Sequence, residues 1–140
     1  MIIAVDFDGT LVEHRYPAIG KEILFAFETL RELQKQKHQL ILWTIRSGKE
    51  LDEAIEFCKE RGIEFYAINN SYPEEKFDGT SSRKIQADVY IDDRNIGGLP
   101  GWGEIWHMLT PGENPDLKEE LRRLPKTQGL LKQFLKKFFS

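Results

Sequence analysis

The first ten residues constrain the fold more than any other stretch of the chain. Residues 1–5 are all apolar and run directly into two carboxylates, Asp6 and Asp8, which are followed by Gly9. A short apolar run that ends at a turn signal is typical of a strand buried on both faces of a sheet. Because side chains alternate along a strand, Asp6 and Asp8 leave the sheet on the same side. Two carboxylates at such a short distance repel each other. A bound divalent cation is the simplest way to offset this repulsion.

Length and composition predict one soluble globular domain. The chain has 140 residues, of which 40% are hydrophobic and 31% charged, a balance unlike that of disordered proteins. The net charge of −3 gives no support for a protein that coats nucleic acid. The single Cys58 excludes an intramolecular disulfide and fits a reducing compartment. Because no membrane span or signal peptide is recognisable, we expect a cytoplasmic location.

A helix, a second strand and a second helix are predicted after the first strand. Apolar side chains recur at helical spacing over residues 19–36, which indicates a helix with one buried face. Residues 40–43 form another buried strand, which ends at Thr44. Ser47 and Glu50 then make a capping-box pattern, which predicts a helix start. The free N–H groups at such a start suit an anion.

The rest of the pattern predicts the fold class. Further strands are expected over residues 63–68 and 87–91, and a short fifth strand over 104–107. Strands that alternate with helices favour right-handed βαβ units. We therefore expect an α/β fold, with a Rossmann-like parallel sheet covered by helices on both faces.

Two loops are expected to border the site. Residues 9–20 carry His14, Arg15 and Tyr16, which could contact a substrate, although exposed loop side chains are more often only solvated. Residues 69–83 form a polar loop long enough to suggest a function.

Polar side chains follow three of the predicted strands where each strand ends. Asp6 and Asp8 follow the first strand, Thr44 the second, and Asp92 and Asp93 the fourth. In parallel α/β sheets, ligands bind outside the carboxyl ends of the strands. The sequence therefore predicts that these five side chains form one site.

Four motifs, taken in order, resemble those of the haloacid dehalogenase (HAD) superfamily. They are Asp6-Phe7-Asp8-Gly9-Thr10, then Thr44, then Lys84 shortly before the fourth strand, and then the pair Asp92-Asp93. The resemblance covers roughly residues 1–98. Most HAD proteins are Mg²⁺-dependent phosphotransferases with an aspartyl nucleophile, so the resemblance implies this chemistry and the HAD-type fold.

The resemblance also implies a role for each motif residue. Asp6 would be the nucleophile that forms an aspartyl-phosphate, and Asp8 the general acid/base. Thr44 would hydrogen-bond the phosphoryl group. Lys84 would steady the nucleophile and the phosphate as a point charge. Asp8 argues against dehalogenation, because the dehalogenases of the family typically lack this residue.

Cationic partners of the phosphate are less sharply defined by the sequence. Lys76 and Arg83 compete with Lys84 for the role of the motif lysine. Arg46, two residues after Thr44, could contact phosphate or substrate, whereas Arg94 could equally form a structural ion pair.

The implied metal is Mg²⁺, which prefers octahedral oxygen ligands and retains several waters. Asp6, the backbone carbonyl of Asp8 and the Asp92 side chain would hold it. Asp93 would add a second carboxylate, directly or through water.

These roles predict a Mg²⁺-dependent phosphomonoester hydrolase, that is, a phosphatase. Two alternatives stay open. One is a phosphotransferase with an acceptor other than water, and the other is a non-catalytic module that binds a phospho-ligand or a protein. Neither residues 7–43 nor residues 69–83 leave room for a folded cap domain, so we expect a capless member. Such members commonly act on large substrates or oligomerise, and small phosphorylated molecules stay possible.

The C-terminal segment lies outside the resemblance. We expect residues 1–110 to form the catalytic core and residues 111–140 a helical extension of the same domain. Residues 111–125 indicate a turn and a short charged helix. Residues 126–140 contain four lysines and no acidic residue, opposite an apolar helical face. Docking on the sheet is the first interpretation of this helix, and homodimerisation is the alternative.

Overall fold

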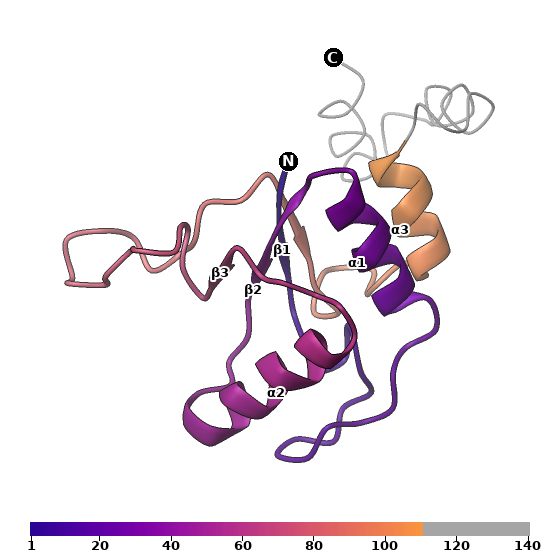
Figure 1. Cartoon of the computed structure of the whole chain (residues 1–140), viewed down its shortest axis with the longest axis horizontal. Helices are drawn as coiled ribbons and strands as arrows, with labels where there is room; N and C mark the ends of the chain where they lie inside the picture. The colour runs from indigo at the N-terminus through magenta and orange to yellow at the C-terminus, as the bar shows by residue number, and fades with distance from the viewer. Residues whose placement is uncertain (111–140) are drawn as a thin grey trace. The chain divides into compact units, whose positions relative to one another are not determined.

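The computed structural model describes residues 1–110, so the helices expected over 111–125 and 126–140 lie outside the described residues (Figure 1). The chain divides into two compact units, Met1–Leu99 and a second unit that begins at Pro100. The described part of the second unit contains helix α3 (Trp102–Leu109). The elements of the first unit are β1 (Ile2–Val5), α1 (Ala26–Lys35), β2 (Gln39–Leu42), α2 (Gly48–Glu60), β3 (Ala67–Ile68) and β4 (Val89–Ile91).

The four strands form one parallel sheet in the order β3-β2-β1-β4. β1 pairs on both sides, with Ile3 opposite Leu40 of β2 and Val89 of β4. This central position explains its uninterrupted apolar sequence, because a strand in the middle of a parallel sheet has no face in water. The predicted α/β class with a Rossmann-like parallel sheet is confirmed.

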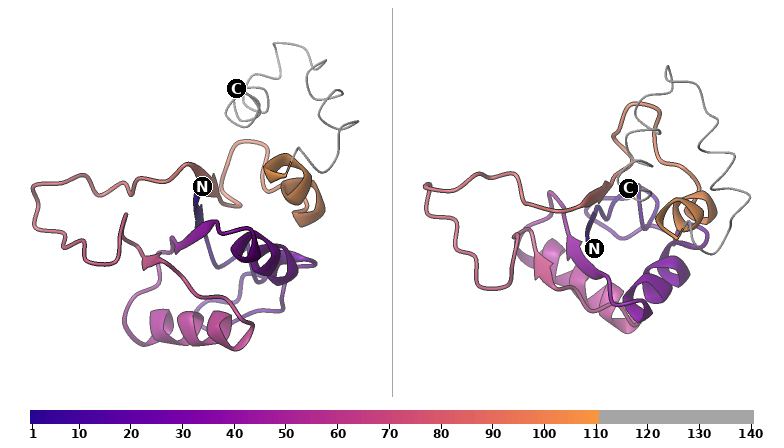
Figure 2. Two further views of the ribbon diagram at one scale, coloured as in Figure 1. Left: turned by 45° about the horizontal axis from the view of Figure 1, so that its top comes forward. Right: turned by 90° about the horizontal axis from the view of Figure 1, so that it is seen from above.

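Both helices of the first unit lie on the same face of the sheet (Figure 2), so within Met1–Leu99 the expected helices on both faces are not found. The ring of Phe57 on α2 lies 5.8 Å from that of Phe27 on α1 and 6.0 Å from that of Phe7, measured between centroids. The Arg31 side chain of α1 also donates to the backbone carbonyl of Arg61 after α2, at 2.9 Å. The main core therefore lies between the sheet and this pair of helices.

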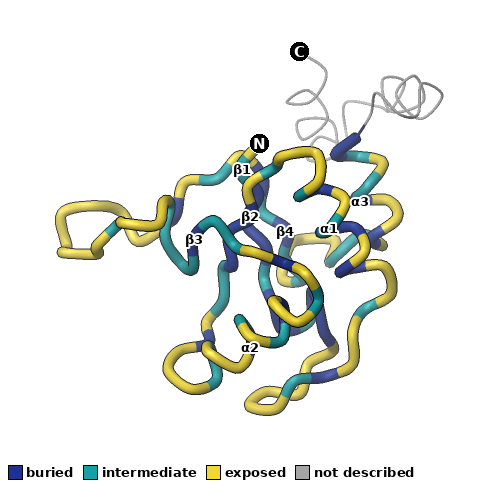
Figure 3. Tube along the Cα trace, viewed as in Figure 1, coloured by how far each residue is buried: buried dark blue, intermediate teal, exposed yellow. Residues whose placement is uncertain are grey.

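The other face of the sheet carries a smaller apolar cluster. The strands that contribute to it are largely buried along their backbone trace (Figure 3). Its buried members are Ala4, Ile41, Ala67 and Ile85. Ile85 comes from the long connection between β3 and β4, and its carbonyl accepts a hydrogen bond from the Tyr90 hydroxyl. Partly buried side chains, including Trp43, pack around this cluster.

The helix predicted over residues 19–36 begins only at Ala26, so its first third was wrong. The preceding residues pair instead with the loop after β1: Glu13 N–H donates to Lys21 at 2.8 Å, and Ile23 N–H donates to the Leu11 carbonyl at 2.9 Å. The left-handed backbone at Phe25, with φ of 66°, then sets the start of the helix. Of the apolar residues before it, Leu24 and Phe25 are exposed and Ile19 and Ile23 are half-buried.

Two strand predictions also need correction. The fifth strand over 104–107 is wrong, because this stretch lies within α3, where Trp102, Ile105 and Leu109 are buried at helical spacing. The third strand is Ala67–Ile68 rather than 63–68. α2 begins directly after Ser47, as predicted, although the Ser47 side chain makes no capping hydrogen bond.

The connections leave the carboxyl ends of the strands without a further domain. Between β1 and β2 the chain contains only a loop and α1, and between β3 and β4 it forms no helix.

Within residues 1–110, no helix has the length and hydropathy needed to cross a membrane.

Candidate functional site

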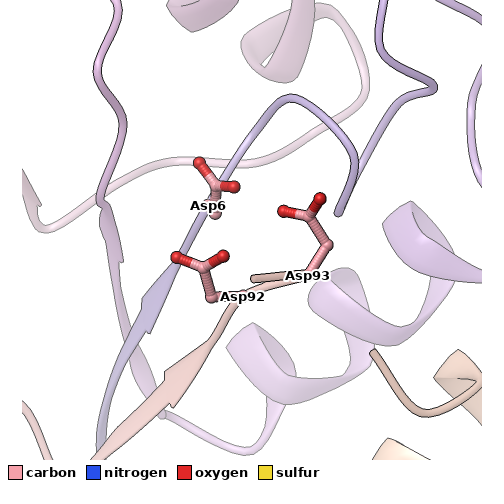
Figure 4. Close-up of side chains that lie close together, drawn as sticks. All are labelled: Asp6, Asp92 and Asp93. Carbon is pink, nitrogen blue, oxygen red and sulfur yellow. The ribbon is translucent and has the colours of Figure 1, made fainter. Parts of the chain in front are cut away.

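Three carboxylates meet where β1 and β4 end side by side (Figure 4). Asp6 follows β1, and Asp92 and Asp93 follow β4, and each offers one oxygen atom within 4.8 Å of the others. The Asp6 N–H donates to the Ile91 carbonyl at 3.0 Å, which continues the strand pairing up to the site. The structure thus brings together the three side chains that the sequence proposes as direct or water-mediated metal ligands.

This donor set fits a hard divalent cation. Three partly exposed carboxylates supply only oxygen ligands and leave further positions to water, which matches the preference of Mg²⁺. Asp6, Asp92 and Asp93 would hold the ion, and its charge would offset the repulsion among them.

The electrostatics of the cluster show how strongly these carboxylates interact. Burial, followed by the negative charges of Asp92 and Asp93, raises the pKa of Asp6 from 3.8 to about 7, against a lowering hydrogen bond from the Phe7 backbone. Burial also opposes ionisation of Asp93, but its hydrogen bonds with His14 and Asp6 outweigh this, so the pKa of Asp93 lies below its ordinary value. Asp6 therefore gives up its proton less readily than an exposed aspartate, whereas Asp93 gives up its proton more readily.

The Asp8 side chain does not join this cluster. Its two oxygens accept hydrogen bonds from Arg46 Nε and Nη2, both at 2.7 Å. Both side chains are almost fully buried, with Arg46 at 0% and Asp8 at 9% exposure. If Asp8 takes part in metal binding, it does so through its backbone, as the resemblance implies.

The remaining donors of Arg46 are used within the protein. Nη2 donates to the Ala18 carbonyl at 2.8 Å, and Nη1 donates to the carbonyls of Pro17 and Glu50 at 3.2 and 3.4 Å. A guanidinium has five N–H donors, so all five have partners. The guanidinium also lies 5.1 Å from the ring centroids of Phe7 and Tyr16. Arg46 therefore has no donor to offer the phosphate that it was predicted to contact.

Thr10 and His14 complete the surroundings of Asp93. The Thr10 hydroxyl accepts a hydrogen bond from Asp93 N–H at 3.1 Å and lies 3.3 Å from Asp93 Oδ1. His14 Nε2 lies 3.1 Å from Asp93 Oδ2. The sequence singled out His14 only as a substrate contact and gave Thr10 no role of its own, although Thr10 is part of the first motif.

Gly9 provides the space that this arrangement needs. A Cβ at Gly9 would meet Asp93 Oδ2 and His14 Nε2 closer than real Cβ atoms approach, on a backbone with φ of +82°. We expect Gly9→Ala to displace both side chains and to weaken Mg²⁺ binding at least tenfold in isothermal titration calorimetry, in line with the effect of supporting groups at metal sites. Gly97→Ala is the matched control, because Gly97 has φ of +90° and open space around it. Equal losses in both variants would contradict this explanation.

Thr44 lines the same cavity as Asp6 and Asp92 and is held by hydrogen bonds with its neighbours. Its N–H donates to Asn69 Oδ1 at 2.8 Å, and its hydroxyl oxygen accepts from Arg46 N–H at 3.1 Å. The hydroxyl hydrogen remains available to a ligand, because a hydroxyl both donates and accepts. Sequence reasoning missed Asn69, which has a left-handed backbone with φ of 53°.

The cavity has a volume of about 240 Å³. Its lining residues are Asp6, Asp8, His14, Trp43, Thr44, Ile45, Asp92 and Arg94.

Lys84 does not line this cavity, and its ammonium lies 5.4 Å from the ring centroid of Tyr90. Arg83 lies over the Phe77 ring, 5.3 Å from its centroid. Among the described residues, Arg94 is the one basic side chain of arginine or lysine type in the cavity lining. The structure therefore brings Arg94 to the carboxylates, and not the predicted lysine.

Comparison with known proteins relates the chain to a bacterial structure. No protein-family model matches the chain. The solved structure of a conserved protein from Bacteroides thetaiotaomicron is 62% identical to it, with a TM-score of 0.75, over 80% of this chain and 91% of that chain. The chain belongs to the family of this conserved Bacteroides protein.

A more distant relative of this chain is archaeal. The uncharacterized protein MJ1198 of Methanocaldococcus jannaschii is 28% identical over 118 residues, which cover 76% of this chain. The match spans only 14% of the length of MJ1198.

Proposed function

We propose that the protein is a Mg²⁺-dependent phosphomonoester hydrolase of the HAD type. The observation that carries the proposal is the meeting of Asp6, Asp92 and Asp93 at two adjacent strand ends, with Thr44 on the same cavity. Hard-cation ligands and a phosphate-binding hydroxyl are thereby combined in one open site at the carboxyl end of a parallel sheet.

The proposed reaction uses the side chains in the following order. A carboxylate oxygen of Asp6 attacks phosphorus, the ester P–O bond breaks, and the leaving oxygen takes a proton from a water molecule of the open site. The resemblance assigns this proton transfer to Asp8, but both Asp8 oxygens accept hydrogen bonds from Arg46. A second water molecule then attacks the aspartyl-phosphate, loses its proton to solvent, and releases phosphate and the free Asp6 carboxylate. Bound Mg²⁺ would neutralise charge on the phosphoryl oxygens.

Thr44 and Arg94 would position the phosphoryl group in this proposal. The Thr44 hydroxyl has a hydrogen to donate, and the exposed Arg94 lines the cavity. Arg94 takes the cationic role that the resemblance assigns to Lys84. We retain a phosphorylated small molecule or macromolecule as the substrate, and a cytoplasmic setting that would keep Cys58 reduced.

Turnover of p-nitrophenyl phosphate tests the proposal. We expect hydrolysis with Mg²⁺, none with excess EDTA, and a loss in kcat of at least about 10³-fold in Asp6→Asn, because the nucleophile is removed. Asp52→Asn, which changes an exposed aspartate of α2, should keep full activity. Activity that persists in EDTA or in Asp6→Asn would overturn the mechanism. Mg²⁺ and phosphate binding without turnover would favour a phospho-ligand binding module.

A further inference from the structure

The cavity has an apolar wall that the phosphoryl chemistry does not use. Ile45 lies between Thr44 and Arg46, lines the cavity, and is 94% exposed. Single exposed apolar residues are common on protein surfaces. This one, however, stands directly beside the hydroxyl proposed to hold the phosphoryl group.

The backbone on both sides of Ile45 is fixed. Thr44 N–H is bound by Asn69 Oδ1, and Arg46 N–H by the Thr44 hydroxyl. The Arg46 side chain is buried and fully hydrogen-bonded. The exposure of Ile45 is therefore a consequence of a backbone fixed by hydrogen bonds on both sides, and not of a flexible loop.

Trp43 extends the same wall inward. It lines the cavity and packs against the apolar cluster on the sheet face opposite α1 and α2. Its N–H continues the strand pairing by donating to the Val5 carbonyl at 2.8 Å. Trp43 and Ile45 are thus the two large apolar residues of the cavity lining, one packed against the apolar cluster and one exposed, while the carboxylates and Arg94 supply the charged lining.

We propose that Trp43 and Ile45 bind the organic group of the substrate, which is a phosphate ester of a small apolar or aromatic alcohol. The inference rests on the proposed function, because the phosphoryl group must lie at Asp6 and Thr44 for its ester oxygen to point along this wall. The cavity volume of about 240 Å³ lies below the roughly 300–1,000 Å³ of pockets for drug-sized ligands. A single ring beside the phosphoryl group therefore suits it better than a larger group.

Two esters of primary alcohols test this substrate class. We expect wild-type kcat/KM with Mg²⁺ to be about tenfold higher for 2-phenylethyl phosphate than for 2-hydroxyethyl phosphate, and Ile45→Ser to reduce that ratio about tenfold. Ile96→Ser is the matched control, because Ile96 is 93% exposed and does not line the cavity. An unchanged ratio in Ile45→Ser, or equal changes in both variants, would overturn the inference and leave the phosphatase proposal intact.

Binding of non-hydrolysable analogues separates the inference from catalysis. In calorimetry with Mg²⁺, phenylphosphonate should bind wild type and Ile96→Ser about tenfold more tightly than methylphosphonate, and Ile45→Ser should lose this preference. This result without any ester turnover would support the apolar wall and contradict the hydrolase proposal. Failure of both phosphonates to bind would overturn the inference as well.

Discussion

Replacement of Arg46 by methionine is expected to lower the free energy of unfolding by about 3–5 kcal/mol. The substitution leaves the Asp8 carboxylate buried without its two hydrogen-bonded partners, and an unpaired buried charge typically costs this much. The carbonyls of Pro17 and Ala18 also lose donors. Urea denaturation with an unchanged slope would measure the loss as a shift of the midpoint.

Two further variants show whether burial of the ion pair causes the effect. Lys35→Met breaks an exposed pair with Glu32, whose nearest atoms are 2.9 Å apart, and should cost less than about 1 kcal/mol. The double variant Asp8→Asn/Arg46→Met should be more stable than the sum of the single changes predicts, because the unpaired charge is removed. A cost for Arg46→Met as small as that for Lys35→Met would contradict the assigned role.

Asp6→Asn is expected to stabilise the metal-free protein while it abolishes stabilisation by Mg²⁺. The folded pKa of Asp6, about 7, lies above its ordinary value of 3.8, so the folded state binds the proton more tightly than the unfolded state does. The stability of wild type in EDTA should therefore fall as the pH rises from about 4 to about 7, and level off above this range. Asparagine removes the charge, so the advantage of the variant grows over the same interval.

Thermal melting at several pH values with EDTA or Mg²⁺ measures both effects. At pH 8 in EDTA, the variant should melt about 5 °C above wild type. Mg²⁺ at 100 times its Kd should stabilise wild type by about 2.7 kcal/mol and should leave the variant unchanged. A variant that is less stable than wild type in EDTA at pH 8 would contradict a net cost of burying the Asp6 charge beside Asp92 and Asp93.

The sequence predicted those parts of the fold that follow from local pattern. The apolar run before Asp6 marks β1, and the start of α2 after Ser47 was correct. The helix expected from residue 19 failed because residues 21–23 pair with residues 11–13, a long-range contact that the apolar spacing does not reveal. The 104–107 stretch was read as a strand although Trp102, Ile105 and Leu109 already had helical spacing.

The candidate site divides in the same way. The proximity of Asp6, Asp92 and Asp93 follows from the topology, because parallel strands end at one edge of the sheet. The pairing of Asp8 with Arg46 could not be predicted, since it depends on how a loop folds over the start of α2. The position of Lys84 depends likewise on the path of the long connection before β4, which no local pattern specifies.

The hydrogen bonds of Arg46 have a consequence for the thermodynamics of ligand entry. One side chain joins the loop at Pro17 and Ala18, the Asp8 carboxylate and the start of α2. The conformational entropy of that loop is therefore lost during folding, and a ligand does not have to order it on arrival. In the proposed function, the cavity lined by Thr44 and Ile45 would therefore be preorganised and would select its ligand by a shape that exists before binding.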